Sequence, residues 1–230
     1  MGEPRIIIEN WEGKNNTEER YKKYKELGLY RNLATIWVTP TRGKTLTKIA
    51  FNWMNVIGGF NQALVKFCVE CMEVGAAYNF ALKEIFANPQ FKNFQYLFTV
   101  EEDNTLPPDT LIKLYESIQE YDAVSGLYWL KGPDGVPQIW GDPSSKDNFV
   151  PQKPLPDTIQ RCNGIGMGCA LWRLDMFKNP GFTYGEWFKT GGGMTQDLYF
   201  CKNATALGYK FAVDTRVKVG HVDMESGDIW

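Results

Sequence analysis

The sequence has a single histidine, His221, and this scarcity limits the metal sites that it can build. It has no apolar run near the roughly 18 residues of a membrane span. Its N-terminus, MGEPRIIIEN, lacks the pattern of a signal peptide. A net charge of −2 gives no electrostatic case for a general binder of nucleic acid or anionic membrane. We therefore predict a globular protein that acts in the cytoplasm.

Cysteines are also few and odd in number, namely Cys68, Cys71, Cys162, Cys169 and Cys201. Cys68 and Cys71 form a CxxC motif within VKFCVECME, which has the pattern of a strand. Residues three apart on a strand point to opposite faces, so the pair is not expected to share a metal. Reduced, mostly buried thiols of a cytosolic protein are the favoured interpretation.

Short apolar runs alternate with segments of helical periodicity in the first part of the chain. Strands are predicted over 32–40, 63–71, 95–100 and 123–130, and helices over 45–57, 75–87 and 107–120. This alternation predicts an α/β fold with a mostly parallel, Rossmann-like sheet that helices cover on both faces.

The later part is less regular. The proline-rich stretch 131–160 has no clear period and is interpreted as an excursion over the edge of the sheet. A strand running into a short helix is predicted over 164–177, then a helix over 195–208 and a strand over 210–222.

The sequence contains no internal repeat, so we predict one domain over residues 32–230. Residues 1–31 are predicted to form a peripheral N-terminal segment, with a short charged helix over 16–27.

Three acidic residues, Glu101, Glu102 and Asp103, directly follow the strand predicted over 95–100. A solvated loop would tolerate them, but otherwise their repulsion requires a nearby cation. In an open parallel sheet, ligands bind beyond the carboxyl ends of the strands. The segment TPTRGK (39–44) follows the first strand in the same way, so both segments are expected at one rim. Glu101 and Asp103 then suggest a Mg²⁺ or Mn²⁺ site facing a phosphate or nucleotide site.

This arrangement, followed by GIGMGCALWRLDMF and TQDLYFCKNATALGYKFAVDTRVKVGH, resembles nucleotide-sugar glycosyltransferases of the A fold, the family-2-like group. The resemblance covers residues 32–222. In that family a D-x-D motif ends the third strand and binds the donor's ribose and a divalent metal. Here the motif reads Glu101-Glu102-Asp103. The resemblance implies metal-dependent transfer of a sugar from a nucleoside-diphosphate donor, UDP in particular, with Asp103 as ligand of Mn²⁺ or Mg²⁺.

The resemblance also implies a catalytic base. The family carries an E-D pair on a helix near the acceptor, whose carboxylate is the base in inverting members. In this sequence Gln196 replaces the Glu and Asp197 is retained, so Asp197 becomes the candidate base. The alternative is an acid that only favours the first turn of a helix. Gly191–Gly193 suit a loop that closes over the site.

A histidine after the last strand often completes the metal site in this family, which assigns His221 to the metal; an ordinary core or surface histidine is the alternative. The implied donor-binding residues are Thr39, Pro40, Thr41, Arg42, Asn79, Glu101 and Glu102. Asn79 matches half of an Arg-Asn pair beside the nucleotide, and Tyr78 takes the place of the Arg.

Three tryptophans, Trp129, Trp140 and Trp187, lie in or beside the predicted rim loops. They either stack on a sugar or base or pack in the core.

Two other functions stay open. A sugar-1-phosphate nucleotidyltransferase would need a glycine-rich basic loop after the first strand, and TPTRGK has one glycine. A non-catalytic module that binds nucleotide sugars or glycans is compatible with Glu101 and Gln196. The hydroxyl acceptor, whether a glycan, small molecule, protein or modified nucleic-acid base, is not encoded in a recognisable motif. The compact chain would also suit a viral or phage enzyme.

Overall fold

The computed structural model describes residues 22, 26, 33–58, 63–132, 134–191 and 193–230. The predicted segment 1–31 and its helix 16–27 lie outside the described residues, apart from Lys22 and Glu26, which are helical. The strands are β1 (Thr35–Thr41), β2 (Leu64–Glu70), β3 (Tyr96–Val100), β4 (Asn104–Thr105), β5 (Ala123–Leu127), β6 (Ile139–Trp140), β7 (Ile159–Cys162), β8 (Gly164–Ile165), β9 (Cys169–Arg173), β10 (Phe211–Lys218) and β11 (Gly220–His221). The helices are α2 (Thr47–Met54), α3 (Val74–Ala87), α4 (Thr110–Ser117) and α5 (Gln196–Ala206), with 3-10 turns η2 (Pro89–Phe91), η3 (Ile118–Glu120) and η4 (Leu174–Lys178).

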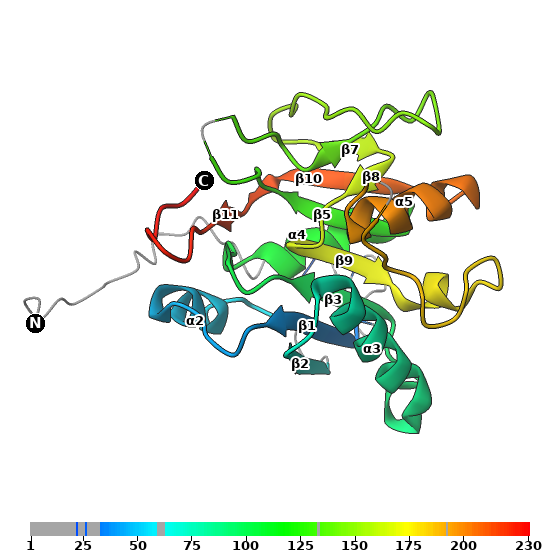
Figure 1. The fold of residues 1–230 in the computed structure, drawn as a ribbon, viewed down its shortest axis with the longest axis horizontal. Helices are drawn as coiled ribbons and strands as arrows, with labels where there is room; N and C mark the ends of the chain where they lie inside the picture. Colours follow the sequence, from blue (N-terminus) through cyan, green and yellow to red (C-terminus); the bar gives the residue numbers. More distant parts are fainter. Residues whose placement is uncertain (1–21, 23–25, 27–32, 59–62, 133, 192) are drawn as a thin grey trace, which may run out of the picture.

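The main sheet has seven strands in the order β2-β1-β3-β9-β5-β10-β7 (Figure 1). Strands β2, β1 and β3 are parallel, and β10 is parallel to β5. Strand β9 runs antiparallel between β3 and β5, and β7 is antiparallel to β10 at the edge. The predicted α/β fold with a mostly parallel sheet is confirmed. Stretch 131–160 contributes β6 and leads into the edge strand β7.

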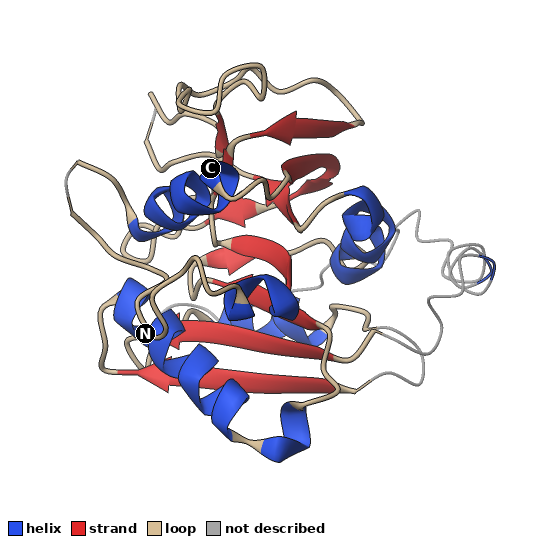
Figure 2. Ribbon diagram, turned by 90° about the vertical axis from the view of Figure 1, so that its right-hand side faces the viewer, coloured by secondary structure: helices blue, strands red, loops and turns tan. Residues whose placement is uncertain are grey.

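Helices cover both faces of this sheet (Figure 2). On β1, the side chains of Ile36 and Val38 join the core beneath α3 and α5. Trp37 points to the opposite face, where it packs in the cluster that includes α4. The consecutive apolar residues Ile36, Trp37 and Val38 of β1 thus reflect burial on both sides, as parallel sheets require.

The glycine-rich run after β8 allows the chain to pass close to Tyr128. A Cβ atom at Gly166 would overlap the Tyr128 hydroxyl, and one at Gly168 would lie 2.6 Å from Asn104 Oδ1. The Gly168 N–H donates a hydrogen bond of 2.9 Å to Tyr128 Oη. These glycines let β9 enter the middle of the sheet beside the end of β3.

A small two-stranded sheet brings the end of the chain next to the acidic triplet. Strand β11 pairs antiparallel with β4, so that His221 lies opposite Asn104. The Val222 N–H also donates a hydrogen bond of 2.7 Å to the Asp103 carbonyl. Residues more than a hundred positions apart in the sequence are thereby neighbours.

Three of the five free cysteines are buried, whereas Cys68 and Cys71 are exposed. Cys71 has a φ of 61°, so β2 ends before it and the CxxC motif does not lie within one strand. The strand predicted over 63–71 is thus one residue shorter at each end. Within the described part of the chain, no helix has the length and apolar character needed to cross a bilayer.

Candidate active site

A cavity of about 470 Å³ lies beyond the carboxyl ends of β1 and β3. Because these strands are adjacent and parallel, the segments that follow them meet at one edge of the sheet. The lining residues are Pro40, Thr41, Arg42, Met72, Val74, Glu101, Glu102, Asp103, Lys131 and Gln196. The structure therefore brings TPTRGK and the acidic triplet to a common rim, as expected from the sequence.

Glu102 fastens these two segments to each other. Its Oε2 accepts hydrogen bonds from the Thr41 hydroxyl (2.7 Å) and the Arg42 N–H (2.8 Å), and its Oε1 accepts one from Arg42 Nε. Burial alone would raise the pKa of Glu102, but the bonds from Thr41 and Arg42 lower it. Hydrogen bonds within the protein thus engage both oxygens of the Glu102 carboxylate. These bonds position Thr41 and Arg42 at the cavity wall.

Asp103 lies between a lysine and the only histidine. Its Oδ2 is 2.6 Å from Lys131 Nζ and 3.4 Å from His221 Nε2. Its Oδ1 is buried and has no hydrogen-bond partner among the described residues. Burial alone would raise the pKa of Asp103, but His221 and Lys131 lower it. Asp103 is therefore a charged carboxylate with one oxygen left to accept a ligand.

The backbone of Trp129 sets the orientation of His221. His221 Nδ1 lies 2.8 Å from the Trp129 carbonyl oxygen, which can only accept a hydrogen bond, so Nδ1 carries the proton. In the neutral ring, Nε2 then directs a lone pair toward Asp103 Oδ2. Two such atoms repel each other unless a proton or a metal ion lies between them.

Asp103 and His221 therefore fit a divalent cation. An oxygen and an imidazole nitrogen face each other, and a second carboxylate oxygen is unsatisfied. Across the described ranges, no group of three or more His, Cys, Asp or Glu side chains is placed to hold a metal. Such an ion would draw its remaining ligands from water and from donor phosphates, a common arrangement for Mg²⁺.

Glu101 differs from its two acidic neighbours in its charge. Burial and the negative charges of Asp103 and Asp197 raise the pKa of Glu101 to about 8, while Lys131 acts in the opposite direction. The neutral carboxyl group therefore predominates at pH 7. In the absence of a metal ion the neutral acid can donate a hydrogen bond, whereas a cation bound nearby would favour its ionised form.

Asp197 lies in the first turn of α5 and is 8 % exposed. Its Oδ1 accepts hydrogen bonds from the Thr195 hydroxyl and from the Leu198 N–H, the latter at 2.8 Å. Burial raises the pKa of Asp197, although these two bonds oppose the shift. The preceding residue, Gln196, lines the cavity, whereas Asp197 is not among the lining residues.

Two residues expected to bind the donor lie away from the cavity lining. Thr39 is 2 % exposed, and its hydroxyl accepts a hydrogen bond of 2.8 Å from Trp37 Nε1. The Asn79 amide holds the backbone of Phe188, donating to its carbonyl at 2.8 Å and accepting from its N–H at 3.0 Å. Both side chains are thus engaged within the protein, and their positions do not support direct donor contacts.

The three tryptophans also lie outside the residues that line the cavity. Trp187 is 2 % exposed and donates a hydrogen bond of 2.9 Å to the Phe177 carbonyl, so it belongs to the core. Trp129 and Trp140 are half-buried. The contribution of Trp129 to the site is its carbonyl oxygen, not its ring.

Lys131 is the site residue that the sequence analysis missed. It lies in a turn after β5, where Leu130 N–H bonds to the Val136 carbonyl at 3.0 Å and Gly132 has a φ of 103°. A signal was present, because a lysine directly follows the strand predicted over 123–130. The reasoning that placed TPTRGK at the rim applies equally to this lysine.

Comparison with models of protein families gives no match, and neither does comparison with curated proteins. Solved structures do resemble the chain. A197 from STIV has a TM-score of 0.59 at 17 % identity, with 85 % of this chain and 92 % of that chain covered. GalNAc-T7 with UDP, GalNAc and Mn2+ has a TM-score of 0.59 at 13 % identity, covering 85 % and 45 %. S. aureus TarS 1-349 in complex with UDP-GlcNAc has a TM-score of 0.50 at 13 % identity, covering 80 % and 58 %.

This likeness establishes the fold. The chain has the GT-A fold of nucleotide-sugar glycosyltransferases, as the sequence resemblance predicts. The chain spans less than two thirds of the length of the GalNAc-T7 and TarS chains that it matches.

Proposed function

We propose that the protein is a glycosyltransferase that moves a sugar from a nucleoside-diphosphate donor, a UDP sugar, to a hydroxyl acceptor. The observation that carries this proposal is the Asp103–His221 pair at the cavity beyond β1 and β3. There Asp103 Oδ2 lies 3.4 Å from His221 Nε2, and the other Asp103 carboxylate oxygen is buried without a hydrogen-bond partner among the described residues, in a GT-A fold. We place the activity in the predicted domain, residues 32–230.

In this proposal the donor lies along the rim from β1 toward β3. Pro40, Thr41 and Arg42 would contact its nucleoside, with Arg42 held in place by Glu102. The diphosphate would lie near Asp103 and Lys131. The structures of GalNAc-T7 with UDP and of TarS with UDP-GlcNAc support the choice of nucleotide.

Asp103 and His221 would hold a Mn²⁺ or Mg²⁺ ion against that diphosphate. When bound, such an ion neutralises the charge that develops on the leaving phosphate. The contribution of the chain is to keep Asp103 ionised and to fix the His221 tautomer through the Trp129 carbonyl. In many proteins, a hydrogen bond to the other ring nitrogen orients a histidine that binds a metal in this way.

The reaction would be a single displacement with inversion. The acceptor oxygen forms a bond to the anomeric carbon, the bond from that carbon to the phosphate oxygen breaks, and the nucleoside diphosphate leaves. Asp197 would take the proton of the acceptor hydroxyl. Its raised pKa makes it a stronger base than an ordinary aspartate. Because Asp197 is not among the residues that line the cavity, a movement at the start of α5 would be needed to complete the approach.

Calorimetry tests the proposal. Wild type and Asp103→Asn are titrated with UDP, with and without Mn²⁺, and donor hydrolysis is assayed with a panel of UDP sugars. We expect Mn²⁺-dependent UDP binding in the wild type, loss of that dependence in Asp103→Asn, and slow hydrolysis of one donor. Binding without turnover of any donor would favour the non-catalytic module. Equal affinity of both proteins for UDP in Mn²⁺ would remove Asp103 from the site.

A further inference from the structure

The outer edge of β2 is open among the described residues. Strand β2 ends the main sheet and pairs only with β1 there. It is seven residues long, LVKFCVE, and has no proline. An edge strand without a second partner exposes backbone N–H and C=O groups that can pair with another chain.

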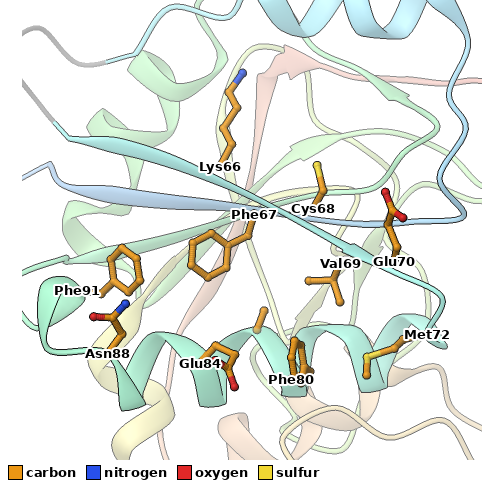
Figure 3. Close-up of a pocket in the computed structure, with 11 residues that line it drawn as sticks. Lys66, Phe67, Cys68, Val69, Glu70, Met72, Phe80, Glu84, Asn88 and Phe91 are labelled. Carbon is orange, nitrogen blue, oxygen red and sulfur yellow. The ribbon is translucent and has the colours of Figure 1, made fainter.

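A groove of about 630 Å³ runs between this edge and α3. Phe67 and Val69 point into it from β2, whereas Lys66, Cys68 and Glu70 point to the opposite face of the sheet (Figure 3). Apolar side chains also line it from outside the strand. Phe80 is 44 % exposed and Met72 is 46 % exposed.

The charged side chains of β2 form no ion pair within the described part of the chain. Lys66 and Glu70 are exposed, and neither forms an ion pair there. Lys66 Nζ lies 4.3 Å from the centre of the Trp37 ring. The two charged residues lie two positions either side of Cys68 on one face of the strand.

We propose that β2 pairs antiparallel with β2 of a second copy of this chain, about a two-fold axis through Cys68. In that register Lys66 of each copy lies directly opposite Glu70 of the other, on one face. On the other face, Phe67 lies opposite Val69 of the second copy, over the groove. Cys68 lies opposite itself. Directly opposed residues on antiparallel strands share a face, so opposite charges and apolar groups both match.

Neighbouring registers lack this match. An axis through Phe67 places Lys66 opposite Cys68, and an axis through Val69 places Glu70 opposite Cys68. An axis through Lys66 or Glu70 places like charges against each other, which is unfavourable. The self-complementary pattern thus selects a second copy, in a single register, as the occupant of the groove.

The pairing predicts which thiol can link two copies. Opposed Cα atoms on antiparallel strands are about 4.5 to 5.5 Å apart, within the range of a disulfide. Cys71 lies three residues from the axis, so two Cys71 residues would be roughly 20 Å apart. Both thiols are exposed in the single chain, so exposure alone does not distinguish them.

The first experiment oxidises the native protein mildly with copper phenanthroline and analyses it on a non-reducing gel. We expect a disulfide-linked dimer in the wild type and in Cys71→Ser, and none in Cys68→Ser. Linkage through Cys71, or equal linkage in all three proteins, would overturn the register. The inference does not depend on glycosyl transfer, since neither the gel nor the sedimentation described next measures catalysis.

The second experiment measures the monomer–dimer equilibrium by analytical ultracentrifugation. Lys66→Glu and Glu70→Lys each place like charges opposite each other twice, and we expect either change to weaken the dimer about tenfold or more. The double variant Lys66→Glu/Glu70→Lys restores opposite charges and should recover most of that loss. Equal dissociation constants in all four proteins would overturn the proposal. So would a wild type that stays monomeric at all protein concentrations measured; protection of its β2 amides from hydrogen exchange would then show that the chain covers its own edge.

Discussion

His221 Nε2 lies 3.4 Å from Asp103 Oδ2, while the opposite ring nitrogen bonds to the Trp129 carbonyl at 2.8 Å. The second contact places a proton on Nδ1, so in a neutral ring Nε2 faces the carboxylate with a lone pair. A proton on Nε2 or a metal ion between the two atoms relieves that repulsion. Removing His221 should therefore weaken metal binding and leave the nucleoside contacts intact.

We predict that His221→Ala raises the Mn²⁺ concentration needed for half-maximal UDP binding by on the order of tenfold or more. Calorimetric titration of Mn²⁺ at fixed UDP measures this shift. Affinity for uridine, which carries no phosphate, should be unchanged and serves as the control. Identical Mn²⁺ titrations in the variant and the wild type would leave His221 with a structural role alone.

Lys131 offers the second prediction, because its ammonium group lies 2.6 Å from the same Asp103 oxygen. In the proposed site, a metal ion and Lys131 would compete for that carboxylate until a diphosphate bound the lysine. In Lys131→Met, Mn²⁺ alone should bind more tightly, whereas UDP without metal should bind more weakly. Electron paramagnetic resonance of free Mn²⁺ and calorimetry with UDP in chelator separate the two effects. Lys146→Met, in an exposed loop, is the matched control. Changes of the same sign in both measurements would contradict the competition.

Much of the fold was predictable because buried apolar residues recur in the sequence with the period of a strand or a helix. Strands such as β1 and β3 have mostly apolar centres that are buried on both faces and are followed by amphipathic helices, a pattern typical of parallel sheets. The direction of β9 was not predictable. An apolar run that is buried on both faces reads the same in either direction, and only its partners β3 and β5 fix its orientation.

The sequence allowed us to predict which segments meet at the rim of the sheet, but not which side chains contact each other there. Strand ends place Thr41 beside Glu102, but the sequence does not indicate that Glu102 is used up by hydrogen bonds from Thr41 and Arg42. Nor does it indicate that Asn79 holds the Phe188 backbone. Such contacts depend on loop conformations, which short polar segments do not specify by periodicity.

The high pKa of Glu101 predicts a pH-dependent stability. Burial and nearby acids raise this pKa from 4.5 to about 8, so the folded protein binds a proton that the unfolded chain releases. The stabilisation is complete below pH 4.5 and is lost as the pH rises toward 8. In metal-free buffer, the free energy of unfolding should fall across this window, with a slope of at most about 1.4 kcal/mol per pH unit from this group.

Glu101→Gln keeps the shape of the neutral acid and removes its titration. We expect the variant to have a shallower slope between pH 5 and 8 in urea unfolding experiments, and to be more stable than wild type at pH 8. Asp197, whose pKa is also raised, would account for the slope that remains. Parallel curves for the two proteins would show that Glu101 ionises normally.

Gly166 allows a test of the packing around Tyr128. Because a Cβ atom there would overlap the Tyr128 hydroxyl, Gly166→Ala should lower the free energy of unfolding by about 1 to 3 kcal/mol. Removing that hydroxyl makes room, so Gly166→Ala/Tyr128→Phe should be more stable than Gly166→Ala alone. Tyr128→Phe is the required control, since it also loses the hydrogen bond from Gly168. If the loss of unfolding free energy in the double variant equals the sum of the losses in the two single variants, the Tyr128 hydroxyl is not what Gly166→Ala overlaps.

Asp197 carries the last prediction, which concerns catalysis. Its Oδ1 is held by Thr195 and Leu198, so an asparagine with its amide oxygen at that position keeps both hydrogen bonds. Asp197→Asn loses only the basic oxygen, and removal of a general base typically costs about 10² to 10⁴ in rate. We therefore expect kcat to fall by that order once an acceptor is found, with UDP affinity and thermal stability nearly unchanged.

The pH profile distinguishes a base from a residue that only supports the start of α5. In wild type, kcat should rise with pH through the raised pKa of Asp197, because the ionised form accepts the proton. This rise should be absent from the residual activity of Asp197→Asn. Asp175→Asn, which changes an exposed aspartate, is the matched control and should retain full activity with the wild-type profile. If Asp197→Asn unfolds the protein or keeps the wild-type rate and profile, the acid serves the helix alone and the single displacement has no base on this chain.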